Sequence, residues 1–164
     1  MTASVWRIAT DTPDYEADDL SGAGAKATGG RWNEKGAAVL YCSASIALAA
    51  LETLVHLGSA GLPLNRYLVR IDIPDHIFAA AEVLDAATAP VGWDARPAGR
   101  ASIACGTRWL AGRKTLCLVV PSIVAPEESN ILINPLHPDI GSITATKLRR
   151  WDYDPRLRGG PGPA

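Results

Sequence analysis

Glu52 has the clearest potential for chemistry, because it is the only formally charged side chain in residues 36–65. It lies in an apolar run from Ile46 to Leu57, and at helical spacing it shares a face with Leu48 and Val55. Burying a carboxylate without partners is unfavourable by several kcal/mol. Two interpretations follow: a carboxylate at the floor of a cleft, where it binds hydroxyls or stabilises positive charge, or a structural salt bridge to an arginine on a neighbouring strand.

The segment 29–33, Gly-Gly-Arg-Trp-Asn, has the composition of a ligand-binding loop. Gly30 and its glycine neighbour let the backbone pass close to a ligand, and Arg31 offers a planar fork suited to phosphate oxygens. Trp32 is a candidate pocket wall, and Tyr41 ends the next predicted strand, where side chains often converge on a cleft. The alternative is a tight turn with a surface arginine and a core tyrosine.

Two further polar residues each follow a predicted buried strand. Ser122 comes after Pro121, and Asn134 opens the segment Asn134-Pro-Leu-His-Pro138. A serine nucleophile with His137 as its base is conceivable, but the flanking prolines favour rigid turns and the chain has no G-x-S-x-G motif. We therefore expect Ser122 to be a hydrogen-bond donor and Asn134 to be a structural or ligand-binding amide.

Composition narrows the class of protein. The chain has 164 residues, a net charge of -1 and 48% hydrophobic residues, which predicts one soluble globular domain. Basic residues are scattered among acids, which argues against direct binding of nucleic acid. The three histidines are isolated, so no metal site is expected. The amino terminus does not resemble a signal peptide, and we expect no membrane span.

The cysteines point to the compartment. Cys42, Cys105 and Cys117 form no C-x-x-C pair, and each lies in an apolar segment. They are typical of buried free thiols in a reducing environment, which predicts a cytoplasmic protein.

The predicted elements give an α+β domain around a central mixed β-sheet. Runs rich in β-branched and aromatic residues predict strands at Val5–Ile8, Ala38–Cys42, Tyr67–Ile73, Leu116–Val120 and Ile131–Ile133. Helices are predicted at Ser45–Leu57, capped by Ser43 or Ser45 and stopped by Gly58, and at Arg100–Ala111, ended by Gly112. Residues 11–30 are predicted to form a loop, and residues 159–164 a frayed tail rich in glycine and proline.

Taken in chain order, these segments resemble the RES domain, the toxin half of bacterial RES-Xre toxin-antitoxin pairs. The matching pieces are Trp6-Arg7-Ile8, Gly29-Gly-Arg-Trp-Asn33 with Gly36, Val39-Leu-Tyr41, Ala49-Ala-Leu-Glu52, Trp109-Leu110, Val120-Pro-Ser122, Asn130-Ile-Leu-Ile-Asn-Pro135 with His137-Pro138, and Asp154-Pro-Arg-Leu157. Their order and spacing extend the resemblance over residues 1–158. The arginine, glutamate and serine that name the domain correspond to Arg31 or Arg7, to Glu52 and to Ser122.

The resemblance implies a fold similar to ADP-ribosyltransferase toxins and an activity that consumes NAD as substrate. Some members of the family destroy NAD by hydrolysis or phosphorolysis, and others transfer ADP-ribose to a protein. For this chain we expect hydrolysis or phosphorolysis, which would deplete the cell of NAD and arrest growth; the alternative is transfer of ADP-ribose to a cellular protein. The resemblance also implies a partner, an Xre-like helix-turn-helix antitoxin that would bind the chain and block the pocket.

The implied chemistry assigns a role to each candidate residue. Glu52 would accept hydrogen bonds from ribose hydroxyls and stabilise the oxocarbenium-like charge that develops as nicotinamide leaves. Tyr41 would stack on nicotinamide. The other expected contacts are Arg31 and Arg7 on the pyrophosphate or ribose, Ser122 and Asn134 on the nicotinamide or ribose side, and Trp32 excluding water. A competing hypothesis is a non-enzymatic binding module, in which Glu52 and Arg31 form a buried ion pair.

Overall fold

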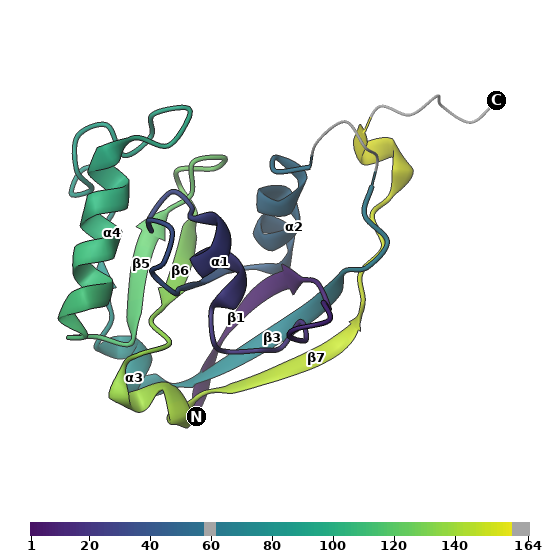
Figure 1. Ribbon diagram of the computed structural model, residues 1–164, viewed down its shortest axis with the longest axis horizontal. Helices are drawn as coiled ribbons and strands as arrows, with labels where there is room; N and C mark the ends of the chain where they lie inside the picture. Colours follow the sequence, from purple (N-terminus) through teal and green to yellow (C-terminus); the bar gives the residue numbers. More distant parts are fainter. Residues whose placement is uncertain (58–61, 159–164) are drawn as a thin grey trace.

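The computed structural model describes residues 1–57 and 62–158. One seven-stranded sheet runs through this part of the chain in the order β4-β5-β6-β2-β1-β3-β7 (Figure 1). The strands are β1 (Thr2–Ala9), β2 (Leu40–Ser43), β3 (Tyr67–Pro74), β4 (Glu82–Val83), β5 (Cys117–Pro121), β6 (Ser129–Ile133) and β7 (Thr144–Arg150). The helices are α1 (Ala23–Thr28), α2 (Ile46–Leu54), α3 (Asp75–Ala79) and α4 (Arg100–Gly112), with 3-10 turns at Pro138–Ser142 and Pro155–Arg158.

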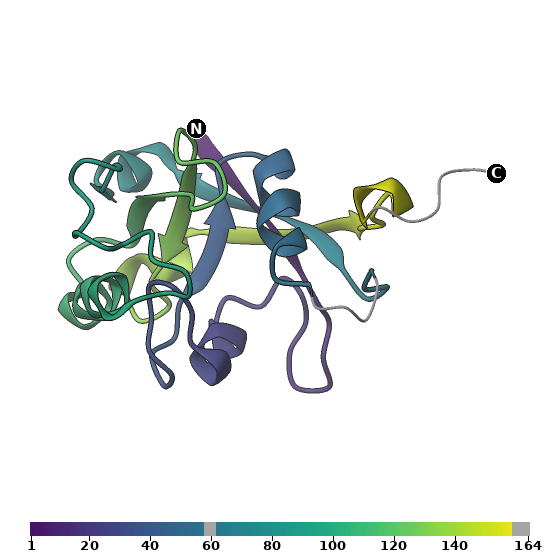
Figure 2. The same cartoon turned by 90° about the horizontal axis from the view of Figure 1, so that it is seen from above.

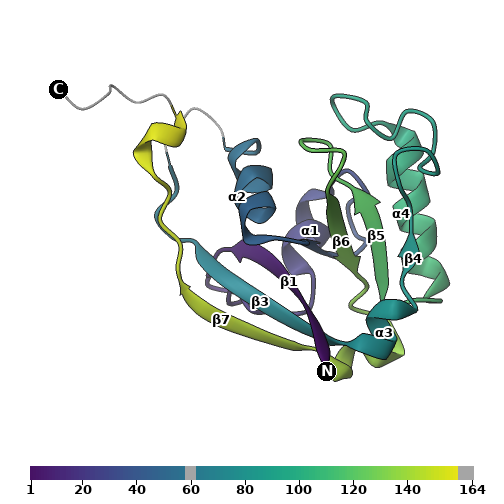
Figure 3. The same cartoon turned by 180° about the vertical axis from the view of Figure 1, so that it is seen from behind.

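The sheet is mixed, because β4 pairs parallel with β5 whereas the other neighbouring strands pair antiparallel. Figure 3 shows β4 at one edge and β7 at the other. In every view α4 lies at one end of the molecule, and the turn at Pro155–Arg158 lies at the opposite end (Figures 1 and 2). The predicted α+β domain around a mixed sheet is confirmed.

The five predicted strands and the two predicted helices all form, while four shorter or more polar elements were missed. Strand β7 contains three cations and lies half exposed at the sheet edge, so it lacks the apolar alternation of a buried strand. Strand β4 has two exposed residues. The prediction of a loop over residues 11–30 was wrong in part, because α1 lies within it and has no buried residue to mark it.

The start of α2 and the end of α4 agree with the predicted capping chemistry, but α2 ends at Leu54, so the predicted end at Leu57 was wrong. The Ser45 side chain accepts a hydrogen bond from the Leu48 amide at 3.1 Å and caps α2. Helix α4 ends at Gly112, and Arg113 takes the left-handed conformation that follows it, with φ of 48°. The predicted stop at Gly58 and the predicted tail at 159–164 lie outside the described residues.

Strands β5 and β6 are buried on both faces, as predicted for the run at 116–120. Cys117 and Ile133 belong to one core cluster, together with residues of β1 and β3. Leu118 and Leu132 belong to a second cluster on the opposite face, which α4 covers with Trp109. The thiols were predicted to be buried. Two of them are, and burial raises the pKa of Cys42 to about 11 and that of Cys117 to about 12, but Cys105 is only partly covered.

The sheet opens between β1 and β2. These strands are paired at one register position, Trp6 with Ser43, whereas β1 pairs with β3 along its whole length. Arg7, Ile8 and Ala9 therefore leave the pairing with β2 and line a cleft, opposite Leu40 and Tyr41.

Gly106 on α4 determines how closely this helix approaches segment 29–33. A Cβ at Gly106 would lie 1.9 Å from the Trp32 carbonyl oxygen, so only a residue without a side chain allows the contact.

We predict that Gly106→Ala lowers the free energy of unfolding by at least about 1–3 kcal/mol, the usual range for overpacking, because a backbone atom must move. Gly112→Ala in the same helix is the matched control, since a Cβ there meets nothing within 4 Å. It should be neutral or stabilise by up to about 1 kcal/mol. Urea denaturation of both variants measures the difference, and equal midpoints would contradict the steric argument.

Candidate functional site

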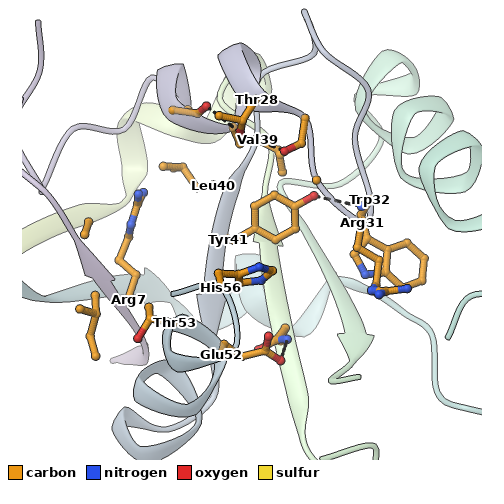
Figure 4. Close-up of a pocket in the computed structure, with 18 of the residues that line it drawn as sticks. Arg7, Thr28, Arg31, Trp32, Val39, Leu40, Tyr41, Glu52, Thr53 and His56 are labelled. Carbon is orange, nitrogen blue, oxygen red and sulfur yellow. Dashed lines mark hydrogen bonds between the residues drawn. The ribbon is translucent and has the colours of Figure 1, made fainter. Parts of the chain in front are cut away.

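A cleft of about 840 Å³ lies where β1 and β2 part. Its walls come from β1, α1, the segment after α1, β2, α2, and loops at 97–98 and 121–123 (Figure 4). The cleft brings together most of the residues singled out in the sequence, namely Arg7, Gly30, Arg31, Trp32, Tyr41 and Glu52.

Glu52 lies at the end of a continuous hydrogen-bond network. Its Oε1 accepts hydrogen bonds from Ser122 Oγ at 2.6 Å and from Asn130 Nδ2 at 2.7 Å. Asn130 is held in turn by Ser43, whose hydroxyl donates to Asn130 Oδ1 at 2.8 Å and so directs the amide nitrogen to Glu52. Oε2 accepts no hydrogen bond from the described residues. Residues of two strands, β2 and β6, and of the turn after β5 thus fix the carboxylate of α2 with one oxygen available to a ligand.

The surroundings of Glu52 differ from the sequence expectation in two respects. Leu48 is 2% exposed but Val55 is 54% exposed, because α2 ends at Leu54 and Val55 no longer continues the apolar face of the helix. No ion pair among residues 1–57 and 62–158 includes Glu52, so the structural salt bridge to a neighbouring arginine is not formed.

Ser122 is fully buried and links Glu52 to the turn between β5 and β6. Its Oγ donates to Glu52 and accepts from the amides of Val124 and Ala125, both at 3.1 Å. Ser122 is therefore a hydrogen-bond donor, as expected. Its hydroxyl makes no hydrogen bond to His137, whose Nδ1 accepts from the Asp139 amide at 3.1 Å, so the serine and histidine do not form a hydrolase pair.

Tyr41 joins the floor of the cleft to segment 29–33. Its hydroxyl donates to Asn33 Oδ1 at 2.6 Å and accepts from the Trp32 amide at 3.0 Å. Burial raises the pKa of the Tyr41 phenol, which stays protonated. A Cβ on Gly30 would lie 2.8 Å from this hydroxyl, so the glycine leaves room for tyrosine as well as for a ligand.

Arg31 is partly committed to the protein itself. Its Nη1 donates to the carbonyl oxygens of Trp93 and Ala95, both at 2.8 Å, and so holds a loop whose next residues, Pro97 and Ala98, line the cleft. Burial, followed by the nearby charge of Arg96, lowers the pKa of Arg31. The rest of the Arg31 guanidinium makes no hydrogen bond to the described residues.

Arg7 and Trp32 occupy opposite sides of the cleft (Figure 4). Arg7 Nη1 is buried and has no hydrogen-bond partner among the described residues, as is also true of Trp151 Nε1, but Arg7 lines the cleft, where its guanidinium can donate to a ligand. Trp32 is only 2% exposed and packs in the core cluster beneath α4. Its side chain therefore supports the wall of the cleft from the core, and contributes less to covering the opening of the cleft against water.

Asn134 does not reach this cleft. It is 1% exposed, its Nδ2 donates to the Leu110 carbonyl at 2.9 Å, and its Oδ1 accepts from the Leu136 amide at 3.0 Å. The amide joins the end of β6 to α4, which is the structural alternative considered from the sequence. The amides that do serve the site, Asn33 and Asn130, both lie in segments quoted for the resemblance, but nothing in the sequence marked them.

The RES domain family model matches residues 4–155. The chain belongs to the RES domain family. It is 62% identical over 157 residues to a protein of Sphingobium sp. (strain YBL2) named Prs ADP-ribosylating toxin, covering 96% of this chain and 98% of that protein. Proteins named Toxin Res from Yersinia enterocolitica and Photorhabdus laumondii are 36% and 37% identical, covering 88% and 87% of this chain and 93% and 90% of theirs.

The cleft of this RES domain shows no site for a metal ion. Among residues 1–57 and 62–158, no three or more His, Cys, Asp or Glu side chains are grouped so that they could hold one. In the same part of the chain, every helix is too short or too polar to cross a bilayer.

We predict that Tyr41→Phe lowers the free energy of unfolding by about 1–3 kcal/mol, because it leaves Asn33 Oδ1 and the Trp32 amide without their partner. Hydrogen exchange at the Trp32 amide should accelerate as well. Tyr15→Phe is the control, since Tyr15 lines the same cleft and its hydroxyl makes no hydrogen bond to the described residues. If both variants behave alike, the hydroxyl of Tyr41 does not hold the segment.

Proposed function

We propose that this RES-domain protein is a toxin that breaks the nicotinamide–ribose bond of NAD and transfers the ADP-ribose to a protein. The observation that carries the proposal is the carboxylate of Glu52, fixed at the floor of the cleft by Ser122 and Asn130. A carboxylate without a cationic partner is suited to stabilise positive charge on a substrate.

The chemistry of NAD explains why one carboxylate is enough. The nicotinamide ring is a cation, so it leaves as a neutral molecule and needs no general acid, unlike the leaving group of an ordinary glycoside. As the bond lengthens, positive charge develops on the ribose. Glu52 Oε2 accepts a hydrogen bond from a ribose hydroxyl and, because Oε1 is already held by two donors, the carboxylate does not reorient during the reaction.

The other residues of the cleft bind two different parts of NAD, the nicotinamide and the pyrophosphate. The ring of Tyr41 stacks on nicotinamide, since its hydroxyl is already used by the protein. Arg7, and the part of Arg31 that is not bound to the loop, hold the pyrophosphate. Gly30 lets the ligand approach the backbone. Asn134 has no part in this scheme, because it lies outside the cleft.

The acceptor of ADP-ribose distinguishes this proposal from its closest alternatives, hydrolysis and phosphorolysis. The name of the Sphingobium relative, Prs ADP-ribosylating toxin, supports a protein acceptor. The protein that this name calls Prs is therefore the first acceptor to test. Transfer to water or to inorganic phosphate would instead destroy NAD outright and stop growth by depletion. A non-enzymatic binding module is less well supported, because the ion pair it requires between Glu52 and Arg31 is not among those formed by the described residues.

The cellular setting follows from the same proposal. A toxin that consumes NAD in the cytoplasm must be restrained in the cell that makes it, and an Xre-like helix-turn-helix antitoxin that covers the cleft would do this. The free thiols of the chain accord with a reducing compartment.

The experiment that tests the proposed function follows NAD by proton NMR with the purified chain, with and without phosphate and with and without Prs. A parallel incubation with labelled NAD detects ADP-ribose on protein. We expect nicotinamide release together with labelling of Prs. Nicotinamide release with free ADP-ribose or its phosphorylated form as the only co-product would identify hydrolysis or phosphorolysis instead.

Glu52→Gln should slow nicotinamide release by at least roughly 10²–10³-fold, the usual effect of removing one electrostatic stabiliser. The amide oxygen can still accept from Ser122 and Asn130, so the fold and the affinity for NAD should be retained. Thermal unfolding and NAD titration of the variant verify this. Turnover at the wild-type rate would refute the role of Glu52.

Arg7→Met should weaken the binding of NAD without lowering the stability of the fold. Removing a buried donor without a partner should leave the free energy of unfolding unchanged or raise it, while NAD binds at least about tenfold more weakly, as expected for loss of a charge-assisted hydrogen bond. Arg70→Met is the control, because Arg70 is paired with Asp72 and does not line the cleft. Unchanged affinity in Arg7→Met would remove Arg7 from the site.

A further inference from the structure

His56 lines the cleft and has no role in the scheme above. It comes two residues after α2, where its backbone amide donates to the Thr53 carbonyl at 3.2 Å and fixes the turn. The imidazole is exposed and makes no hydrogen bond to the described residues. In Figure 4 it points into the space between the Tyr41 ring and Glu52, toward the centre of the cleft.

The three histidines of the chain have different surroundings. His137 is 9% exposed, and its Nδ1 accepts a backbone hydrogen bond that caps a 3-10 turn. His76 is exposed on α3 and does not line the cleft. Of the three, His56 is the one that lines the cleft with an exposed imidazole and makes no side-chain hydrogen bond to the described residues.

Transfer of ADP-ribose to a hydroxyl or amino group of a protein requires a proton acceptor that cleavage of the nicotinamide–ribose bond does not. Nicotinamide leaves without a proton, but a hydroxyl or ammonium group of the acceptor protein must lose one before or while it attacks. Glu52 is occupied by Ser122 and Asn130 on one oxygen and is assigned to the ribose through the other. The Tyr41 hydroxyl already donates to Asn33. Neither group is available to take this proton.

We propose that His56 is the general base that accepts the proton of the attacking acceptor side chain. This inference rests on the proposed transfer to a protein. The nicotinamide–ribose bond breaks with its electron pair going to nicotinamide, and the acceptor oxygen or nitrogen forms the new bond to the same ribose carbon. Its proton passes to a ring nitrogen of His56 and then to water. Imidazole is the side chain best suited to this exchange near neutral pH.

The test compares His56→Ala with His76→Ala, a matched change at the other exposed histidine. Labelling of the acceptor protein from labelled NAD should fall about 10²–10⁴-fold in His56→Ala, the usual contribution of a general base, and should stay at the wild-type rate in His76→Ala. Added imidazole should restore part of the labelling by His56→Ala and leave His76→Ala unchanged. A purely structural role of His56 would not give this rescue.

Binding is measured separately, in the Glu52→Gln background, where turnover is slow. NAD should bind to Glu52→Gln and to Glu52→Gln with His56→Ala with equal affinity, because a base for the acceptor contributes nothing to the binding of NAD. A loss of affinity as large as the loss of labelling would make His56 a substrate-binding residue and overturn the inference.

The remaining outcomes separate this inference from the proposed function. Wild-type labelling by His56→Ala would refute the base while leaving NAD transfer intact. Nicotinamide release by the wild type without labelling of any protein would refute a protein acceptor, and His56 as its base, while NAD cleavage stands. Absence of nicotinamide release from the wild type would refute the proposed function as a whole.

Discussion

The parting of β1 from β2 is the constraint on which the site depends. After the single pair of Trp6 with Ser43, the two strands no longer pair, and Arg7, Ile8 and Ala9 line the cleft together with Leu40 and Tyr41. If the pairing of these two adjacent strands continued past this point, Arg7 and Tyr41 would lie close together and the cleft would be closed. The rest of the fold holds the two halves of the sheet at this separation. On one side β1 pairs with β3, which pairs with β7; on the other side β2 pairs with β6, which pairs with β5.

The hydrogen-bond network around Glu52 joins α2 to β2, to β6 and to the turn after β5, and it gives the site its rigidity. Ser43 orients Asn130, Asn130 and Ser122 hold Glu52, and Ser122 also binds the turn that follows β5. Each group is fixed by another, so the position of the carboxylate is set before a ligand arrives. Such preorganisation is what electrostatic catalysis requires, because the protein then spends no free energy on turning dipoles during the reaction.

The opposite wall is built by close contact between backbones. Gly106 brings α4 against the carbonyl of Trp32, Gly30 admits the hydroxyl of Tyr41, and Arg31 holds the loop that carries Pro97. Segment 29–33 is therefore held from three directions. Arg7, on the other side of the cleft, differs from these groups: its buried Nη1 has no hydrogen-bond partner among the described residues, a property that it shares with Trp151 Nε1 and that costs stability.

Much of the fold was predictable because it depends on local pattern. Alternating or continuous apolar runs determine β3, β5 and β6, and a serine cap with an apolar face determines α2. Strand β7 was not predictable, since its charged residues become a strand only by pairing with β3 at the sheet edge. Helix α1 was missed for a similar reason, because its small residues carry no periodic signal.

The candidate site, like the fold, was predictable from the sequence only in part. The sequence by itself marked Glu52 and Arg31 as candidates, because an isolated carboxylate in an apolar helix and an arginine after two glycines are chemically unusual. Only the tertiary structure decided between the amides of Asn130 and Asn134, which lie four residues apart at the two ends of β6. The first faces Glu52 and the second faces α4. The reason is that a side-chain amide has the same hydrogen-bonding capacity at either end of a strand, and its role is set by the partners that long-range packing brings to it.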